Sequence, residues 1–371
     1  MSLPAVILVG GQGTRLLPLT ERTRKDMLPL VDRPLLAYTF EHLRRHGVRR
    51  GIVSCGYLPT QIREHFGNAY GELALDYEVE DAPLGTGGAI GFAARDLGET
   101  FFALNGDSLR EADLDALLAF HRTTGAKATI LLTPVSDPSR YGLVRLGAEG
   151  RVSSFLEKPR PEEIDTNLIN AGLYVLEPSV LDLISPGRAV SIEREVFPQL
   201  CAEGSVYGLS LPGYWLDVGT PDSYLQAQHD VLERRFRTEV GDELGRDFML
   251  VAPSAEVHPE ARLVPPVYVG ENARIGAGAC VGSLAVIGAG AVIGAGSTVE
   301  SSVVGARAIV GVGSTISGSI LGEDAELGEE CGALGLSVVG PGARVASRNT
   351  LDHGLRLAAD VELPAGAVSF S

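Results

Sequence analysis

A glycine-rich loop near the start of the chain carries residue types that suit a polyphosphate. Gly10, Gly11 and Gly13 follow an apolar run at 5–9, so the backbone can turn tightly and direct several N–H groups at one ligand. Arg15 adds a planar cation that holds phosphate oxygens well. The loop lacks the Gly-Lys-Ser/Thr of a P-loop and the spacing of a GxGxxG fingerprint, and taken alone it also fits a plain strand-to-helix turn. We expect a nucleoside triphosphate here.

Lysine is rare in this chain, which makes each lysine informative. Among 31 basic residues the sequence holds only Lys25, Lys127 and Lys158. Because arginine is the usual basic residue here, a lysine indicates a place where a compact ammonium is needed and a guanidinium is not equivalent. Lys25 follows the glycine loop closely, and Lys158 falls in a second motif described below. Survival by chance is the alternative explanation.

Length, charge and cysteine content limit the class of protein. With 371 residues the chain is long enough for two domains. Its net charge of −16 argues against nucleic acid or an anionic membrane as partner, and an acidic phosphate-binding protein often recruits a divalent metal. The four cysteines are scattered without a CxxC pair, which indicates reduced thiols and a cytoplasmic protein. We expect no targeting segment, because the first apolar run is short and lacks a basic lead-in.

Residues 1–236 alternate apolar runs with amphipathic stretches. This alternation predicts a Rossmann-like α/β domain with a mostly parallel sheet, whose ligands bind at the carboxyl ends of the strands. The histidines of the amphipathic stretches, His42, His46 and His121 among them, are expected to be solvated rather than ligating. The expected strands lie at 5–9, 51–55, 73–78, 101–104, 128–133 and 172–176, and helical patterns cover 34–45 and 111–121.

A six-residue period replaces this pattern from residue 257 to the end at 371. Aliphatic residues recur six apart from Val269 to Val299, and the next one, Val304, comes after only five. The step of six then resumes through Val310 and Ile316, and a second step of five leads to Leu321. Neither a soluble helix nor a membrane span has this period. The pattern resembles hexapeptide repeats, which form a left-handed parallel β-helix with one aliphatic residue pointing inward at each step. We expect residues 237–256 to link the domains, and the β-helix to support a homo-oligomer.

The motifs of both halves together resemble those of sugar-1-phosphate nucleotidylyltransferases, also called nucleotide-sugar pyrophosphorylases. Within this family the likeness is greatest to bacterial mannose-1-phosphate guanylyltransferases that carry a hexapeptide-repeat domain. Two departures are Asp26, where many members have proline, and Gly87, where alanine is usual. The shared motifs are GGQGTRLLPLT with KDMLP, PLGTGGA at 83–89, NGDS at 105–108, YGLV at 141–144, FLEKP at 155–159, NAGLYVL at 170–176 and WLDVGTP at 215–221.

The resemblance implies roles for the charged residues of these motifs. Asp107, at a strand end, and Asp217, in the turn at 215–219, would share one Mg²⁺ through carboxylate oxygens. Without a metal, Asp107 would simply form a hairpin turn, and Asp217 would cap a helix. Arg15 would clamp the β- and γ-phosphates, and Lys25 would lie near the reacting phosphates. The nucleotide would also contact the residues Gly10, Gly11, Gly13, Thr14, Glu80, Gly85 and Thr86.

The sugar phosphate is assigned to a second set of residues by the same resemblance. Lys158 would contact its phosphate and orient the attack, whereas Glu157 and Asn170 would bond sugar hydroxyls. Gly142 would let the backbone approach the sugar, with an exposed turn glycine as the alternative. No general base is needed, because a sugar phosphate with a second pKa near 6 is mostly dianionic at pH 7. It would attack the α-phosphate in line and release pyrophosphate.

Glu80 bears on the choice of base. Relatives that use UTP or dTTP have a glutamine at this offset from the PLGTGGA segment, whereas a carboxylate presents only acceptors, which match the N1–H and N2–H₂ of guanine. We therefore expect GTP, with a water-facing turn cap as the alternative for Glu80. Mannose 1-phosphate is the expected sugar, although no motif reads out its hydroxyls.

Other functions stay open on the sequence alone. The enzyme could use UTP or dTTP with a glucose, N-acetylglucosamine or heptose 1-phosphate. A regulatory scaffold subunit of such an enzyme is a non-enzymatic alternative, but those members usually lack a metal aspartate or a phosphate-binding cation, and this chain has both. A bifunctional enzyme would need a histidine base on the β-helix, and only His258 and His353 qualify.

Overall fold

The computed structural model describes residues 3–11, 13–56 and 60–369, so Gln12 of the glycine loop lies outside the described residues. Two compact units emerge that do not follow the order of the chain. Unit 1 comprises Met1–Gly11 and Leu36–Trp215, and unit 2 comprises Gln12–Leu35 and Leu216–Ser371. The segment 12–35, which holds the rest of the glycine-loop motif, therefore groups with residues that lie about half the chain away.

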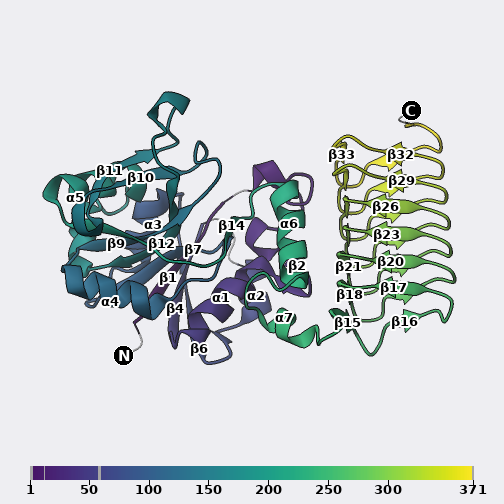
Figure 1. Cartoon of the computed structure of the whole chain (residues 1–371), viewed down its shortest axis with the longest axis horizontal. Helices are drawn as coiled ribbons and strands as arrows, with labels where there is room; N and C mark the ends of the chain where they lie inside the picture. The colour runs from purple at the N-terminus through teal and green to yellow at the C-terminus, as the bar shows by residue number, and fades with distance from the viewer. Residues whose placement is uncertain (1–2, 12, 57–59, 370–371) are drawn as a thin grey trace. The chain divides into compact units, whose positions relative to one another are not determined.

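A ten-stranded sheet forms the centre of unit 1 in the described residues (Figure 1). Its main path runs β11-β10-β12-β7-β1-β4-β6-β5, and β9 joins β12 to β13. The strands of unit 1 are β1 (Ala5–Val9), β4 (Arg50–Cys55), β5 (Ala69–Tyr70), β6 (Leu73–Val79), β7 (Phe101–Asn105), β8 (Ser108–Arg110), β9 (Ala128–Pro134), β10 (Gly142–Leu146), β11 (Val152–Glu157), β12 (Leu168–Leu176) and β13 (Val206–Ser210).

The sheet is parallel on one side and antiparallel on the other. Strands β7, β1, β4 and β6 run parallel, as the strand–helix alternation predicts. Strand β12 instead pairs antiparallel with β7, β9 and β10, and β10 pairs antiparallel with β11. Residues 142–176 contain no α-helix, and antiparallel neighbours need no crossover helix between them. The α/β fold is thus confirmed with a mixed sheet.

Helices and their buried residues cover both faces of this sheet. Every residue of β1 except Leu8 is buried, as expected for a strand packed on two sides. The helices of unit 1 are α1 (Leu35–Arg45), α2 (Thr60–Phe66), α3 (Gly85–Ala93), α4 (Leu114–Thr124) and α5 (Phe197–Glu203), with a π-helical turn η6 (Ile192–Val196) and the 3₁₀ turns η3 (Ala148–Gly150), η4 (Pro161–Glu163) and η5 (Pro178–Leu183).

Two histidines expected at the surface are buried in the sheet–helix interface. His42 is 2% exposed and His121 is 1% exposed. The His121 ring bonds Thr129 Oγ1 at 2.8 Å and Glu177 Oε1 at 3.1 Å, so its polar atoms are satisfied. Burial lowers the pKa of both imidazoles, which keeps them neutral at pH 7. The prediction of solvation is therefore wrong for His42 and His121, because burial depends on the segments that pack against each helix.

Unit 2 begins with the loop segment and a long helix. The helix α6 (Pro221–Leu232) is capped by Thr220, whose hydroxyl accepts from Ser223 N. Gln228 on this helix accepts from Val31 N at 2.6 Å and donates to Pro29 O at 3.0 Å, which ties the helix to the segment 12–35. The other elements here are η1 (Thr14–Leu16), η2 (Lys25–Met27), β2 (Pro29–Leu30), β3 (Arg33–Pro34), β14 (Trp215–Asp217) and α7 (Glu239–Glu243).

The rest of unit 2 is a stack of short parallel strands in three sheets, the arrangement of a left-handed parallel β-helix (Figure 1). The first sheet holds β15 (Met249–Val251), β18 (Val267–Val269), β21 (Ala285–Ile287), β24 (Val303–Val304), β27 (Ile320–Leu321), β30 (Val338–Val339) and β33 (Arg356–Leu357). The second holds β16 (Glu256–Val257), β19 (Arg274–Ile275), β22 (Val292–Ile293), β25 (Ile309–Val310), β28 (Glu326–Leu327), β31 (Arg344–Val345) and β34 (Glu362–Leu363). The third holds β17 (Arg262–Val264), β20 (Cys280–Gly282), β23 (Thr298–Glu300), β26 (Thr315–Ser317), β29 (Gly332–Ala333) and β32 (Thr350–Leu351).

The six-residue period is confirmed as the inward register of this β-helix. The aliphatic residues of the repeat belong to one buried cluster, and those after both five-residue slips, Val304 and Leu321, are 0% exposed. A small residue two positions earlier, such as Ala291 or Ala308, shares this core. Where it is serine, the hydroxyl bonds the backbone of the next turn, as when Ser297 Oγ donates to Gly311 O at 2.7 Å. The β-helix begins at Met249, within the predicted linker.

Membrane spans and disulfides are the remaining points of the fold. Within the part of the chain that the structure describes, no helix combines the length and the apolar character that a membrane crossing needs. The uncharged run between Arg274 and Glu300 lies in the β-helix. All four cysteines are free, as their spacing predicts.

A pair of isoleucines tests the inward register. Ile287 is 0% exposed in the β-helix core, whereas Ile309 is 42% exposed on its surface. We expect Ile287→Ala to lower the free energy of unfolding by about 2–5 kcal/mol, because it leaves a cavity in a close-packed core. The matched change Ile309→Ala should cost about 0.5 kcal/mol or less. Urea unfolding of each variant measures the difference, and equal losses would contradict the register.

Candidate active site

The turn that carries Asp107 is built tightly against the first strand. Gly106 N donates to Leu8 O at 2.9 Å, and a Cβ on Gly106 would lie 2.7 Å from Val9 Cγ1, so only glycine fits there. A Cβ on Gly11 would lie 3.9 Å from Asp107 Oδ2. The start of the glycine loop and the Asp107 carboxylate therefore lie side by side at the carboxyl ends of β1 and β7, as parallel neighbours require.

The motifs assigned to the sugar meet beside this turn in unit 1. Gly142 pairs with Glu157 across β10 and β11, and a Cβ on Gly142 would lie 3.0 Å from Glu157 Oε2. Gly172 adopts a positive φ of 68°, where a Cβ would lie 2.6 Å from Asn105 Nδ2. The NGDS and NAGLYVL motifs are thus in contact, although Gly172 follows Asn105 by 67 positions in the chain. Their glycines are needed for close approach.

Hydrogen bonds already orient the polar groups of this sugar-side cluster. Asn170 Nδ2 donates to Tyr174 Oη at 2.8 Å, and Asn170 Oδ1 accepts from Gly172 N at 2.9 Å. Burial, and then Glu193, raise the pKa of Glu157, while Lys158 lowers it. Lys158 itself is exposed and has a positive φ of 52°, and its N–H donates to Tyr141 O at 3.1 Å. An exposed ammonium at a strand end is well placed to meet an anion from solvent.

Glu80 and the PLGTGGA segment are held by unit 1 itself. Glu80 is half-buried, with Oε2 accepting from Leu84 N at 2.9 Å and Oε1 accepting from Ser54 Oγ at 3.2 Å. Each carboxylate oxygen has a second lone pair, so these bonds orient Glu80 without using all its acceptors. Glu80 can therefore cap this turn and still accept hydrogen bonds from a base.

Thr86 and the glycines in the first turn of α3 pack against residues 190–193. Thr86 Oγ1 donates to Glu193 Oε2 at 2.6 Å and accepts from Ile192 N at 3.0 Å. Gly87 N and Gly88 N both donate to Val190 O, and a Cβ on Gly85 would lie 2.7 Å from that oxygen. No local pattern in the sequence indicates Glu193, because its bond to Thr86 spans 107 residues.

Three of the charged residues assigned to phosphate and metal, Arg15, Lys25 and Asp217, converge within unit 2. Lys25, 6% exposed, lies with Nζ 3.4 Å from Asp217 Oδ1, and Arg15 Nη2 lies 3.7 Å from Asp217 Oδ2. Gly219 makes room for this arrangement, since a Cβ there would lie 2.8 Å from Arg15 Nη2. Gly13 has a positive φ of 62° and packs on Thr20 and Lys25, so it shapes the same segment. Sequence positions 15, 25 and 217 thus share one cluster.

Asp217 occupies a short strand rather than the turn that the sequence indicated. It ends β14, and the cap of the following helix is Thr220, so the helix-cap alternative for Asp217 is excluded. Asp26, the unusual residue after Lys25, is 3% exposed and accepts from Arg24 at 2.9 and 3.1 Å. It therefore neutralises a neighbouring arginine.

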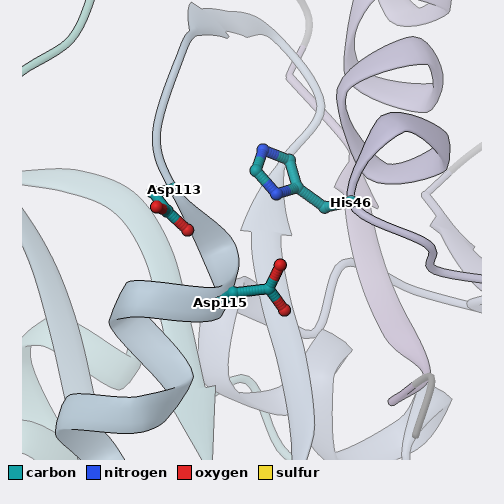
Figure 2. Close-up of side chains that lie close together, drawn as sticks. All are labelled: His46, Asp113 and Asp115. Carbon is teal, nitrogen blue, oxygen red and sulfur yellow. The ribbon is translucent and has the colours of Figure 1, made fainter.

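A further group of metal-ligand residue types lies elsewhere in unit 1. His46, at the end of α1, faces Asp113 and Asp115 at the start of α4, with their ligand atoms within 4.8 Å of one another (Figure 2). Both aspartates are exposed, and Asp113 already caps α4 by accepting from Ala116 N at 2.9 Å. Exposed acidic groups at a helix start are stabilised by the helix dipole without a metal. This group did not emerge from the sequence.

The fold and these clusters together indicate the class of protein. A half-parallel α/β sheet with glycine turns, carboxylates and cations at its strand ends is suited to phosphate-containing ligands, and a parallel β-helix follows it. A family model described as nucleotidyl transferase matches residues 4–234, and one described as the GMPPB C-terminal domain matches residues 246–331. The chain belongs to the nucleotidyl transferase family.

Individual proteins agree with this assignment. A mannose-1-phosphate guanylyltransferase of Mycobacterium tuberculosis is 41% identical over 68% of this chain and 72% of its own length. A probable mannose-1-phosphate guanylyltransferase 2 of Arabidopsis thaliana is 39% identical over 60% of this chain and 63% of its own length. The crystal structure of HddC from Yersinia pseudotuberculosis complexed with GMP-PN has a TM-score of 0.53 and 30% identity, covering 61% of this chain and 98% of that chain.

Proposed function

We propose that this chain transfers a guanylyl group from GTP to mannose 1-phosphate, forming GDP-mannose and releasing pyrophosphate. The observation that carries the proposal is the cluster of Arg15, Lys25 and Asp217, which gathers two cations around one carboxylate in a protein of net charge −16. Such local cation concentration is what a triphosphate needs. The names of the mycobacterial and plant relatives support the choice of substrates.

The reaction follows from charge and alignment. The dianionic sugar phosphate attacks the α-phosphate in line, so the protein has to align two anions and offset their repulsion. We assign Arg15 to the β- and γ-phosphates, Lys25 to the reacting phosphates and Lys158 to the attacking phosphate. Glu157 and Asn170 would bond the sugar hydroxyls, with Gly142 leaving room for the ring. Gly10, Gly11, Gly13 and Thr14 would bring backbone N–H groups to the nucleotide.

Mg²⁺ is the proposed metal, and Asp107 and Asp217 are its proposed ligands. The carboxylate oxygens of Asp217 lie 3.4 and 3.7 Å from their cationic neighbours, which leaves lone pairs for a cation. Carboxylate oxygens are the donors that Mg²⁺ prefers. When bound, the ion would offset charge on the phosphates. His46, Asp113 and Asp115 are not assigned to it.

Cellular setting and assembly belong to the same proposal. The four free cysteines suit a cytoplasmic enzyme, where thiols stay reduced. The β-helix offers a long regular surface for self-association, so we propose a homo-oligomer formed through it.

A panel of nucleotides and sugar phosphates tests the substrates. Pyrophosphate release should be fastest with GTP and mannose 1-phosphate. Faster turnover with UTP or dTTP, or with glucose, N-acetylglucosamine or heptose 1-phosphate, would overturn the assignment.

Glu80→Gln should lower the GTP-to-UTP ratio of kcat/KM by about 10–100-fold, because an amide offers a donor where guanine also donates. The matched variant Glu78→Gln, which loses only an ion pair with Arg95, should keep the ratio. An unchanged ratio in Glu80→Gln would exclude base reading by this residue.

A further inference from the structure

Arg110 lies behind the turn that carries Asp107. It ends β8 and is 5% exposed. Its Nη2 donates to Asn105 O at 2.8 Å and also to Ser108 Oγ. Asn105 and Ser108 flank Gly106 and Asp107 on either side. One guanidinium thus braces both ends of the turn.

This guanidinium is a buried charge without an ion pair. Nε and Nη1 of Arg110 have no hydrogen-bond partner among the described residues, and no carboxylate of those residues forms a salt bridge with it. Burial lowers the pKa of Arg110 to about 10, while Asp107 and then Tyr174 act to raise it, so the side chain stays charged at pH 7. The strongest favourable charge that Arg110 meets is therefore the Asp107 carboxylate.

A buried cation of this kind is costly, so a purely structural role explains it poorly. An apolar side chain of similar size would fill the same space without the desolvation penalty. Both of its hydrogen bonds come from one nitrogen, Nη2, and arginine keeps its charge in a buried position more readily than lysine does. The two bonds that it makes are both to the turn, which indicates that the position of Asp107 is what the charge secures.

The same guanidinium reaches toward the sugar side of unit 1. Tyr174 is fully buried, its hydroxyl accepts from Asn170 Nδ2 at 2.8 Å, and its interaction with Arg110 is electrostatic. Burial lowers the pKa of His42 and keeps its ring neutral, and the charge of Arg110 acts in the same direction. The charge of Arg110 therefore acts on the Asp107 carboxylate and on Tyr174, the hydrogen-bond partner of Asn170.

We propose that Arg110 is a positioning residue for nucleotidyl transfer, which holds the 105–108 turn so that the Asp107 carboxylate can receive the metal–nucleotide complex. This inference rests on the proposed function, in which Asp107 is a metal ligand. Groups that orient a metal ligand typically contribute about 10–100-fold in metal affinity or activity. The effect should therefore appear in metal saturation, which loss of packing alone would not move.

The test compares Arg110→Met, Arg110→Lys and Arg95→Met in the full-length protein. Mn²⁺ binding in the presence of GTP is followed by electron paramagnetic resonance without sugar phosphate, and turnover is measured separately across a Mn²⁺ series. We expect Arg110→Met to raise the half-saturating Mn²⁺ concentration and lower kcat, each by about 10–100-fold. Arg110→Lys should recover part of the loss because it keeps the charge. Arg95→Met, which removes a positive charge from an exposed position, should behave as wild type.

Each outcome bears on one claim. Wild-type Mn²⁺ saturation and kcat in Arg110→Met would overturn the positioning role, even if its thermal stability falls. Should Arg110→Met not fold, Ser108→Ala removes one of the two acceptors and should shift Mn²⁺ saturation in the same direction; no shift would again overturn it. If the wild type binds Mn²⁺–GTP but turns over no sugar phosphate, the proposed function fails while the binding data still decide the role of Arg110.

Discussion

Replacing Lys25 with methionine should lower kcat/KM for GTP by about 10²–10³-fold, the usual effect of removing one preorganised charge from a reacting phosphate. Methionine keeps most of the side-chain volume but removes the charge. Lys25 is 6% exposed and lies 3.4 Å from Asp217, so its ammonium is held in place before substrate arrives. Lys25→Arg should not restore the rate, because a guanidinium is broader than the ammonium that this buried position accommodates. Steady-state pyrophosphate release measures both variants.

Another lysine of this chain supplies the control. Lys127 is exposed and pairs with Glu203 at 2.8 Å, and it belongs to none of the motifs assigned to the proposed site. Exposed ion pairs contribute about 0–1 kcal/mol to stability, so Lys127→Met should fold and turn over as wild type. If Lys25→Met kept the wild-type kcat/KM, the assignment of the Arg15, Lys25 and Asp217 cluster to the triphosphate would fail.

Replacing Asp217 with asparagine should lower kcat by about 10²–10³-fold and also raise the metal concentration needed for half-maximal rate. Asparagine has the same shape but lacks the negative charge that faces Arg15 and Lys25. Lys25→Met should leave the metal saturation curve nearly unchanged, since it removes no proposed metal ligand. A rate series over Mg²⁺ and Mn²⁺ concentration therefore separates the two variants.

The group of His46, Asp113 and Asp115 makes this test sharper. Asp115→Asn removes an exposed carboxylate of the same type from that group. We expect it to leave both kcat and metal saturation as in wild type. A shift in Asp115→Asn with none in Asp217→Asn would move the functional metal to the group at the start of α4, against the proposal.

Regular elements were predictable because their causes are local. The strand at 5–9 and the inward aliphatic residues of the β-helix follow from apolar spacing that any short window of sequence contains. The start of the β-helix was harder to place. Met249–Val251 pairs with Val267–Val269 in the first turn, but a single strand at the end of a stack shows no period of its own.

The antiparallel half of the sheet depended on contacts between distant residues. Strand β12 binds β9 on one edge and β7 and β10 on the other, and no local pattern in 168–176 states those partners. The buried position of His121 has the same origin, since its ring is bonded by Thr129 on β9 and by Glu177, which follows β12. Pairing and burial are properties of the assembled sheet.

The sequence by itself determined which chemical groups the proposed phosphate, metal and sugar sites contain. It also determined the two kinds of fold that hold them, because residue type and spacing are written along the chain. Only the tertiary structure decided how those groups are held. It placed Lys25 and Arg15 on one carboxylate 192 residues or more away, engaged Thr86 with Glu193, and buried Arg110 behind Asp107. Such contacts depend on which distant segments pack together, and packing free energy is shared among many residues rather than specified by any one motif.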